Sequence, residues 1–221
     1  MAPSSDRRSE PPTLFVLAGL PGVGKSTLAR ALAREHGAMW LRVDTVEAAL
    51  LTSGIGRSFA TGLAAYVAAE RVARDQLEIG RSVVLDAVNG VPEARQMWRA
   101  LARATRARRI VIELRLADRA EHRRRVEARA PPTPPLPKPT WAQVVAREYL
   151  PWEEPIVAVD GQRPVRELLA RVRAELAGRA TRRRAEAGAS SGPGAFSPGR
   201  PTHRSRPARR RARARRPTSR P

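Results

Sequence analysis

The residues best suited to chemistry in this chain lie between Gly19 and Thr27. Residues 19–26 read Gly-Leu-Pro-Gly-Val-Gly-Lys-Ser and satisfy the pattern G-x-x-x-x-G-K-[ST] at every fixed position. Such a loop wraps backbone N–H groups around a phosphate, the lysine adds a full positive charge, and the serine hydroxyl binds Mg²⁺. The pattern predicts that the following residues contact a nucleoside triphosphate: Gly19, Leu20, Pro21, Gly22, Val23, Gly24, Lys25, Ser26 and Thr27.

The segments on either side of this loop favour phosphate binding over an ordinary glycine-rich turn. Residues 13–18 form a short apolar run typical of a buried parallel strand, and residues 25–36 are good helix formers that end at Gly37. A helix that begins at Lys25 would point its free N–H groups and its positive dipole end at the bound phosphate.

Strand and helix patterns alternate from residue 13 to residue 178, which predicts an α/β fold with a parallel sheet covered by helices on both faces. We expect strands at 13–18, 39–43, 82–86, 109–116 and 156–159, and helices at 25–36, 61–79, 92–105, 118–128, 140–149 and 165–177. In the second helix, five residues share one face and are expected in the core: Leu63, Tyr66, Val67, Ala73 and Leu77.

Three aspartates, Asp44, Asp86 and Asp160, follow predicted strands at the edge of the sheet where ligands bind in open α/β folds. Asp86 lies at the end of an apolar strand, which is the usual position of a carboxylate that binds Mg²⁺ in P-loop proteins. The alternative roles for Asp86 are a helix cap or a structural hydrogen bond. Asp44 precedes a short helix, so it either caps that helix or orients and deprotonates an attacking hydroxyl group. Asp160 has the pattern of a turn residue.

A basic helix at 118–128 contains Arg119, Arg123, Arg124 and Arg125, and Arg129 follows it. A proline-rich segment comes next, so this helix is placed where a small arginine-rich lid would close over phosphates. Arginines there would stabilise the charge of a transferring phosphoryl group, and we favour Arg125 and Arg129, which are four residues apart, ahead of Arg123. The alternative for each arginine is a solvated helix face.

Aromatic residues are scarce in this chain, and their positions suggest two roles. Arg95 and Trp98 follow Asp86 and are candidates for lining the pocket of a phosphate acceptor. Trp141, Tyr149 and Trp152 are close in sequence, so we expect them to anchor their helix on the sheet, with stacking on a substrate ring as the alternative.

Several of these segments together resemble the bacterial P-loop kinases commonly labelled AAA family ATPase or ATP-binding protein. The resemblance rests on the phosphate-binding loop, Asp44, Asp86, and the segments 91–98, 122–129 and 139–152. These kinases are similar in architecture to gluconate kinase, adenylylsulfate kinase, chloramphenicol phosphotransferase and the zeta toxins. The turn Asn89-Gly90 departs from the family pattern, and Ala87 stands where a ring-forming AAA+ motor would have a second acidic residue.

The resemblance implies a P-loop NTPase fold with a five-stranded parallel sheet and a lid. It implies Mg-ATP as the phosphoryl donor and a hydroxyl group of a small molecule as the acceptor. Catalytic roles are implied for Lys25, Asp44, Arg125 and Arg129, with ATP phosphates on residues 19–27 and Mg²⁺ on Ser26 and Asp86. The alternative is a nucleotide-dependent ATPase or switch protein that binds nucleic acid through a basic tail.

The net charge of +21 is concentrated at the C-terminal end, where residues 179–221 contain fourteen arginines and one glutamate. We expect 1–12 and 179–221 to be disordered tails around a kinase domain at 13–178, because the tails have too few apolar residues to form a core. Only the basic tail could bind nucleic acid. The chain has no cysteine and no long apolar run, so a cytoplasmic monomer or dimer without membrane contact is expected.

Overall fold

The computed structural model describes residues 10–129 and 134–189. Its described residues up to Thr181 belong to one compact unit, and those from Arg182 to Ala189 belong to a second. Most of the two predicted tails, 1–9 and 190–221, and part of the proline-rich segment, 130–133, lie outside the described residues. For these residues the expected disorder stays a prediction, whereas residues 179–189 of the predicted C-terminal tail are helical.

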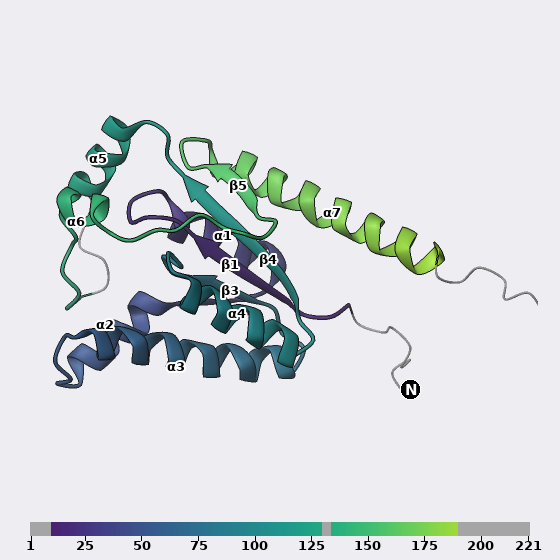
Figure 1. Ribbon diagram of the computed structural model, residues 1–221, viewed down its shortest axis with the longest axis horizontal. Helices are drawn as coiled ribbons and strands as arrows, with labels where there is room; N and C mark the ends of the chain where they lie inside the picture. The colour runs from purple at the N-terminus through teal and green to yellow at the C-terminus, as the bar shows by residue number, and fades with distance from the viewer. Residues whose placement is uncertain (1–9, 130–133, 190–221) are drawn as a thin grey trace, which may run out of the picture. The chain divides into compact units, whose positions relative to one another are not determined.

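The described residues form one five-stranded sheet with the strand order β2-β3-β1-β4-β5, in which every pair of neighbours is parallel. Its strands are β1 Thr13–Ala18, β2 Met39–Arg42, β3 Val83–Asp86, β4 Arg108–Arg115 and β5 Val157–Asp160. The carboxyl ends of all five strands therefore lie at the same edge of the sheet, and the phosphate-binding loop follows the central strand β1 there (Figure 1). The predicted α/β fold is confirmed.

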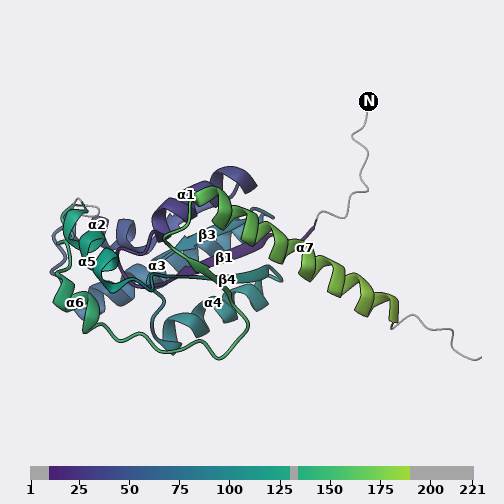
Figure 2. The same cartoon turned by 90° about the horizontal axis from the view of Figure 1, so that it is seen from above.

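Seven helices connect and flank these strands in the described part of the chain. They are α1 Lys25–His36, α2 Val43–Thr52, α3 Phe59–Glu78, α4 Pro92–Ala104, α5 Arg119–Ala128, α6 Trp141–Val145 and α7 Val165–Ala189. Figure 2 shows α1 on one face of the sheet and α4 on the other.

Alternate residues of the central strand supply two separate cores. Leu14 and Val16 pack with the apolar residues of α3 and α4, whereas Phe15 and Leu17 pack with those of α1 and α7. These four side chains are at most 1% exposed. Burial of a strand on both faces explains why β1 reads as a continuous apolar run rather than an alternating one.

The predicted core face of α3 was partly wrong. Leu63 and Val67 are 49% and 42% exposed, whereas small residues at four-residue spacing are buried. The buried residues at this spacing are Thr61, Ala65, Ala69, Ala73 and Leu77, and Glu70 is buried beside them. Hydrophobicity alone favours the larger side chains, but this helix packs through its alanines, which allow a closer approach to its neighbours.

Two helix ends also differ from the sequence prediction. The helix expected at 140–149 ends at Val145, because Tyr149 and the backbone carbonyls of Leu150 and Pro151 are engaged by contacts with the core instead. Helix α7 does not stop near residue 177 but continues to Ala189, since the Ala, Arg and Glu that follow are good helix formers. None of the helices in the described residues is both long and apolar enough to span a bilayer.

Candidate functional site

The phosphate-binding loop adopts a conformation that depends on its glycines. Gly19 has φ of 132° and Gly22 has φ of 90°, both in the region that side chains rarely adopt. A Cβ atom on Gly19 would lie 2.4 Å from the carbonyl oxygen of Leu114, and one on Gly22 would lie 2.7 Å from Cγ2 of Val126. The loop is therefore held tightly between β4 and the lid helix α5.

Helix α1 begins at Lys25 immediately after this loop. Its N-cap is Gly24, which has no side chain to accept a hydrogen bond, and its first turn contains no acidic residue. The helix end therefore keeps its positive dipole without compensation from its own sequence, which suits an anion.

Lys25 lies in the loop with its ammonium group directed back at it, because Nζ donates a hydrogen bond to the carbonyl oxygen of Leu20 at 2.9 Å. Burial lowers the pKa of Lys25 to about 8, while the charges of Asp86 and Asp44 act in the opposite direction. A phosphate bound here would stabilise the protonated form.

Asp86 ends β3 beside the loop and is 4% exposed. Its Oδ2 lies 3.6 Å from Nε of Arg42 and accepts a long hydrogen bond of 3.4 Å from the indole of Trp40. It caps no helix, since the N-cap of the next helix is Val91. A single carboxylate together with the hydroxyl of Ser26 on the same cavity fits Mg²⁺, which takes most of its other ligands from water and phosphate.

Asp44 lies in the first turn of α2 rather than at its cap. The N-cap of this helix is Arg42, and no side chain caps it, so the structure does not place Asp44 in the capping role. The Asp44 side chain is 48% exposed, and its Oδ2 lies 3.8 Å from Nη2 of Arg42. Arg42 therefore lies between the carboxylates of Asp44 and Asp86.

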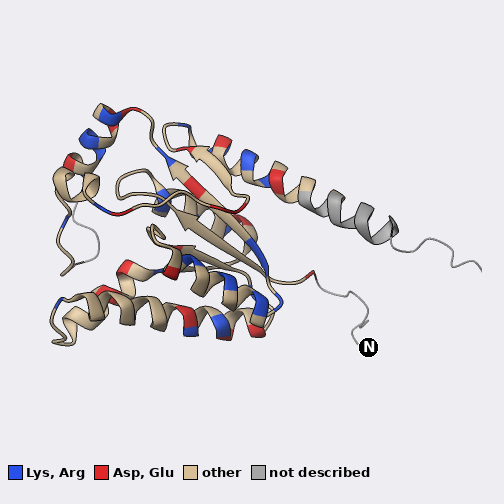
Figure 3. Ribbon diagram, viewed as in Figure 1, with Lys and Arg blue, Asp and Glu red and all other residues tan. Residues whose placement is uncertain are grey.

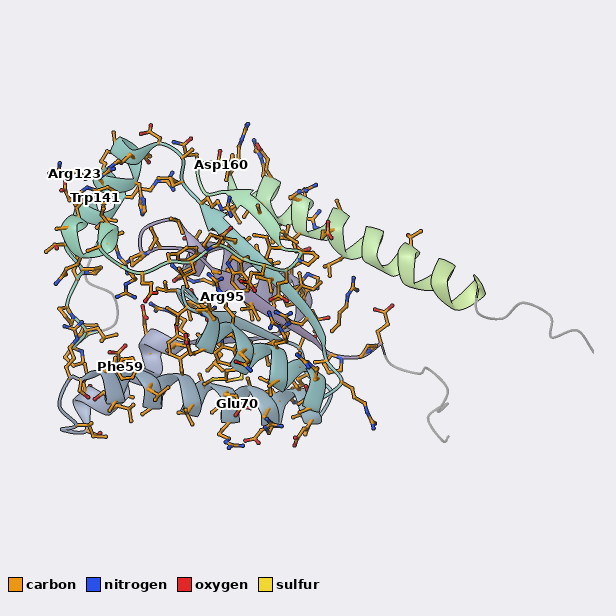
Figure 4. All side chains as sticks on the ribbon, viewed as in Figure 1. Phe59, Glu70, Arg95, Arg123, Trp141 and Asp160 are labelled. Carbon is orange, nitrogen blue, oxygen red and sulfur yellow. The ribbon has the colours of Figure 1, made fainter. Side chains whose placement is uncertain are left out.

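The arginines of α5 divide into those that line the cavity and those that do not. Arg125 donates to Glu121 at 2.6 Å and to the carbonyl oxygen of Gly161 at 2.7 Å, and it lines the cavity with Arg129 and Arg124. Arg123 instead pairs with Glu127 and is 61% exposed, at the outer side of the helix (Figure 4). Arg123, which the sequence analysis placed behind Arg125 and Arg129, therefore does not line the cavity.

The cavity between the loop and the lid has a volume of about 1070 Å³. Its lining also includes residues that the sequence did not single out: Arg30, Arg42, Glu47, Arg57, Lys138, Gln143 and Arg147. Among the described lining residues, nine are Lys or Arg and three are Asp or Glu, and the basic residues of α5 are visible in Figure 3. The cavity therefore suits anionic ligands.

Arg95 and Trp98 do not line this cavity, so their prediction as acceptor-pocket residues was wrong. Arg95 is 5% exposed and donates to the carbonyl oxygens of Asn89, Gly90, Leu150 and Pro151 (Figure 4). Trp98 is fully buried. Both are buried on the inner face of α4, where they bond to Asn89 instead of reaching the cavity.

Asn89, in the turn that departs from the family pattern, is a buried link between two elements. Its Nδ2 donates to the carbonyl oxygen of Leu17 at 2.7 Å, and its Oδ1 accepts from Nε1 of Trp98 at 2.9 Å. Its φ of 51° is in the left-handed region, which asparagine tolerates. The Asn-Gly pair signalled a turn, but not this contact with the strand that leads into the phosphate-binding loop.

Two of the three clustered aromatic residues anchor the chain on the sheet, as expected. Tyr149 donates to the buried carboxylate of Glu113 at 2.7 Å, and the guanidinium of Arg95 stacks on Trp152 at 4.0 Å. Trp141 packs instead against His122 of the lid helix, with ring centroids 5.1 Å apart. Asp160 accepts from the backbone N–H of Gln162, in agreement with its interpretation as a turn residue.

Comparison with solved structures identifies the fold. A gluconokinase from Sinorhizobium meliloti is 20% identical, with a TM-score of 0.58 over 80% of this chain and 98% of that chain. The APS kinase of Mycobacterium tuberculosis, in complex with AMPPNP and APS, is 20% identical with a TM-score of 0.58, covering 75% and 97%. A sugar kinase from Janibacter is 18% identical with a TM-score of 0.55, covering 73% and 92%.

Sequence comparison gives a nearer relationship over a shorter stretch. Uncharacterized proteins of Mycobacterium tuberculosis and Mycobacterium bovis are 38% identical over 114 residues, which is 46% of this chain. The chain matches 22% of the length of these curated relatives. Residues 14–151 match the family model described as AAA domain.

The sheet order, the phosphate-binding loop and these comparisons define a P-loop protein of the kinase or ATPase class. The family match covers more than half of the chain and includes the loop, Asp44 and Asp86. The chain belongs to the AAA domain family.

Proposed function

We propose that this protein is a kinase that transfers the γ-phosphoryl group of Mg-ATP to a hydroxyl group of a small molecule. The observation that carries the proposal is a single cavity with the phosphate-binding loop and Asp44 on one side and the lid arginines on the other. A simple ATPase needs no acceptor space, but this cavity extends beyond the loop along α2.

The phosphate-binding loop would hold ATP through the backbone of residues 19–27 and the ammonium group of Lys25. Ser26 and Asp86 would hold Mg²⁺, which neutralises charge on the β- and γ-phosphates when it is bound. Arg42, between Asp86 and Asp44, would hold both carboxylates in place.

Asp44 would orient the acceptor hydroxyl and take its proton. In this step the acceptor oxygen forms a bond to the γ-phosphorus, the bond from that phosphorus to the bridging oxygen of ADP breaks, and ADP leaves with the electron pair. The exposed position of the Asp44 side chain, 48%, leaves it accessible to an acceptor.

Arg125 and Arg129 would stabilise the charge of the transferring phosphoryl group from the lid side. The bonds of Arg125 to Glu121 and Gly161 hold its guanidinium at the cavity before any ligand binds. Preorganised charge of this kind lowers the cost of reorganisation during the reaction.

The test is ADP formation by the full chain with Mg-ATP and a panel of sugar acids, nucleosides, adenylylsulfate, and aminocyclitol and phenicol antibiotics. We expect at least one acceptor to raise the rate and to gain a phosphoryl group, detected by mass spectrometry. A Lys25→Ala variant controls for contaminating activity. ATP hydrolysis that depends on Lys25 but responds to no acceptor would contradict the kinase and favour the nucleotide-dependent switch.

A further inference from the structure

Arg57 lies on the wall of the cavity that α2 and α3 form, in a loop whose backbone is fixed on both sides. On one side Ser58 caps α3, with its Oγ accepting from the N–H of Thr61 at 3.1 Å. On the other side the Thr61 hydroxyl donates to the carbonyl oxygen of Gly56 at 2.5 Å, and Thr61 is 3% exposed. The cavity lining includes Arg57, which extends from this fixed loop.

Arg147 reaches the same cavity from the opposite side, just after α6. The chain is anchored shortly beyond it, because Tyr149 binds Glu113 and the N–H of Leu150 donates to the carbonyl oxygen of Gly90 at 2.9 Å. Arg95 also donates a hydrogen bond to the carbonyl oxygen of Leu150, which further fixes the backbone of this segment. Arg147 is thus also presented from a fixed backbone.

Neither guanidinium forms a side-chain hydrogen bond or an ion pair within 4 Å with any residue that the structure describes. Three other arginines of the lining are engaged: Arg42 lies between Asp44 and Asp86, and Arg124 and Arg125 bind Glu121. With no such partner among residues 10–129 and 134–189, the guanidinium groups of Arg57 and Arg147 can bind an anion that enters the cavity.

The carboxylates on this wall are Asp44 and Glu47, both on α2. Burial and the charge of Asp44 raise the pKa of Glu47, while Arg57 and Arg147 lower it. Both arginines therefore act on the same group, Glu47, one turn of helix beyond Asp44. They line the cavity that also contains Asp44, on which the hydroxyl group of an acceptor would lie.

We infer that Arg57 and Arg147 form an anion-binding subsite in the acceptor half of the cavity, so that the acceptor is a hydroxyl compound that carries a carboxylate, phosphate or sulfate group. This inference rests on the proposed kinase activity. Guanidinium groups suit all three oxyanions through paired N–H donors. The phosphates of ATP would be bound by Lys25, the loop backbone and the lid arginines, so Arg57 and Arg147 remain for the acceptor.

The first experiment compares acceptors that differ only in the anionic group: gluconate with glucitol, and nucleoside 5′-monophosphates with nucleosides. We expect the anionic member of at least one pair to be phosphorylated, and its neutral partner not. In Arg57→Ala and Arg147→Ala the KM for that acceptor should rise about tenfold or more, with the KM for ATP within about twofold. Equal use of the neutral partner, or an equal loss of ATP binding, would overturn the subsite.

The matched control is Arg71→Ala, which removes one positive charge from an exposed residue that pairs with Glu70 and does not line the cavity. It should leave both KM values unchanged.

A binding measurement separates the subsite from the activity. With the loop saturated by Mg-ADP, sulfate should raise the melting temperature of the wild type and of Arg71→Ala, but not of a double variant lacking Arg57 and Arg147. If sulfate stabilises the wild type in this way but no acceptor is phosphorylated, the proposed kinase activity is contradicted and the anion-binding subsite is retained. A melting temperature that sulfate leaves unchanged in the wild type, or raises equally in the double variant, would remove the site.

Discussion

Nε2 of His122, on the lid helix, lies 2.8 Å from the carbonyl oxygen of Pro21 in the phosphate-binding loop. A carbonyl oxygen can only accept, so Nε2 carries the proton and donates. Val126, one turn further along α5, packs against Gly22 of the same loop. The lid helix is thus joined directly to the loop that holds the phosphates, by one hydrogen bond and one apolar contact.

Replacing His122 by Phe should weaken this joint while keeping a ring to pack against Trp141. The carbonyl oxygen of Pro21 would lose its partner in a buried position, so the free energy of unfolding should fall by about 1–3 kcal/mol. Denaturant unfolding measures this loss, and the KM for ATP should rise with it. His36→Phe is the control, since His36 packs on Phe15 outside the loop. An equal loss of unfolding free energy in both variants would contradict a specific contribution from the contact between α5 and the loop.

The low pKa of Lys25 makes ATP binding sensitive to pH. In the free protein burial lowers this pKa to about 8, so Lys25 loses its proton above that pH, whereas the bound phosphates require the charged form. We expect the Kd for ATP to rise with pH from about 8 upward, approaching tenfold per unit. Calorimetry at pH 7, 8 and 9 tests this.

Lys25→Arg is the control for that titration, because arginine stays protonated throughout the range. Its affinity for ATP should be weaker than that of the wild type but flat between pH 7 and 9. A slope equal to that of the wild type would assign the titration to another group.

Asp44→Asn should separate chemistry from nucleotide binding. The amide keeps the shape of the carboxylate but cannot take a proton, so turnover with acceptor should fall by about 10²–10⁴-fold. The Kd for Mg-ATP, measured by calorimetry, should change by less than about threefold, because in the proposed mechanism Asp44 acts on the acceptor and not on the phosphates. If ATP binding collapses instead, Asp44 is structural.

The lid arginines should differ in their effects according to the face of α5 that they occupy. Arg125→Ala removes a guanidinium held at the cavity by Glu121 and Gly161, so kcat should fall by about 10²-fold or more. Arg123→Ala removes the same charge from the solvent face and should leave kcat within about twofold of wild type. Steady-state kinetics on the two variants distinguishes a positioned charge from a general basic field, in which both would lose activity alike.

Arg95 should prove important for stability rather than for chemistry. Its guanidinium is buried and donates to four backbone carbonyl oxygens, so Arg95→Ala should lower the free energy of unfolding by about 3 kcal/mol or more. Arg99→Ala, on the same helix, breaks an ion pair of 3.4 Å with Glu154 and should cost less than about 1 kcal/mol. Equal stabilities in urea would contradict this assignment.

Local patterns in the sequence were sufficient for the α/β class, the order of most elements and the phosphate-binding loop. These features depend on neighbours in the chain: an apolar strand, glycines that permit positive φ, and a helix that begins at Lys25. Asp44, Asp86, Arg125 and Arg129 were placed at one cavity because parallel strand ends and the lid must meet at the same edge of the sheet.

Contacts between distant segments decided the rest. Which face of α5 meets the cavity, and so Arg124 rather than Arg123, depends on the packing of Val126 against Gly22, more than a hundred residues away in sequence. Arg95 and Trp98 were predicted to line the pocket, but Arg95 bonds to the backbone of Leu150 and Pro151 and Trp98 bonds to Asn89. Arg57 and Arg147 lie ninety residues apart, and only the fold brings two fixed loops to the same cavity. Side-chain burial and charge pairing arise from tertiary packing, which no local pattern encodes.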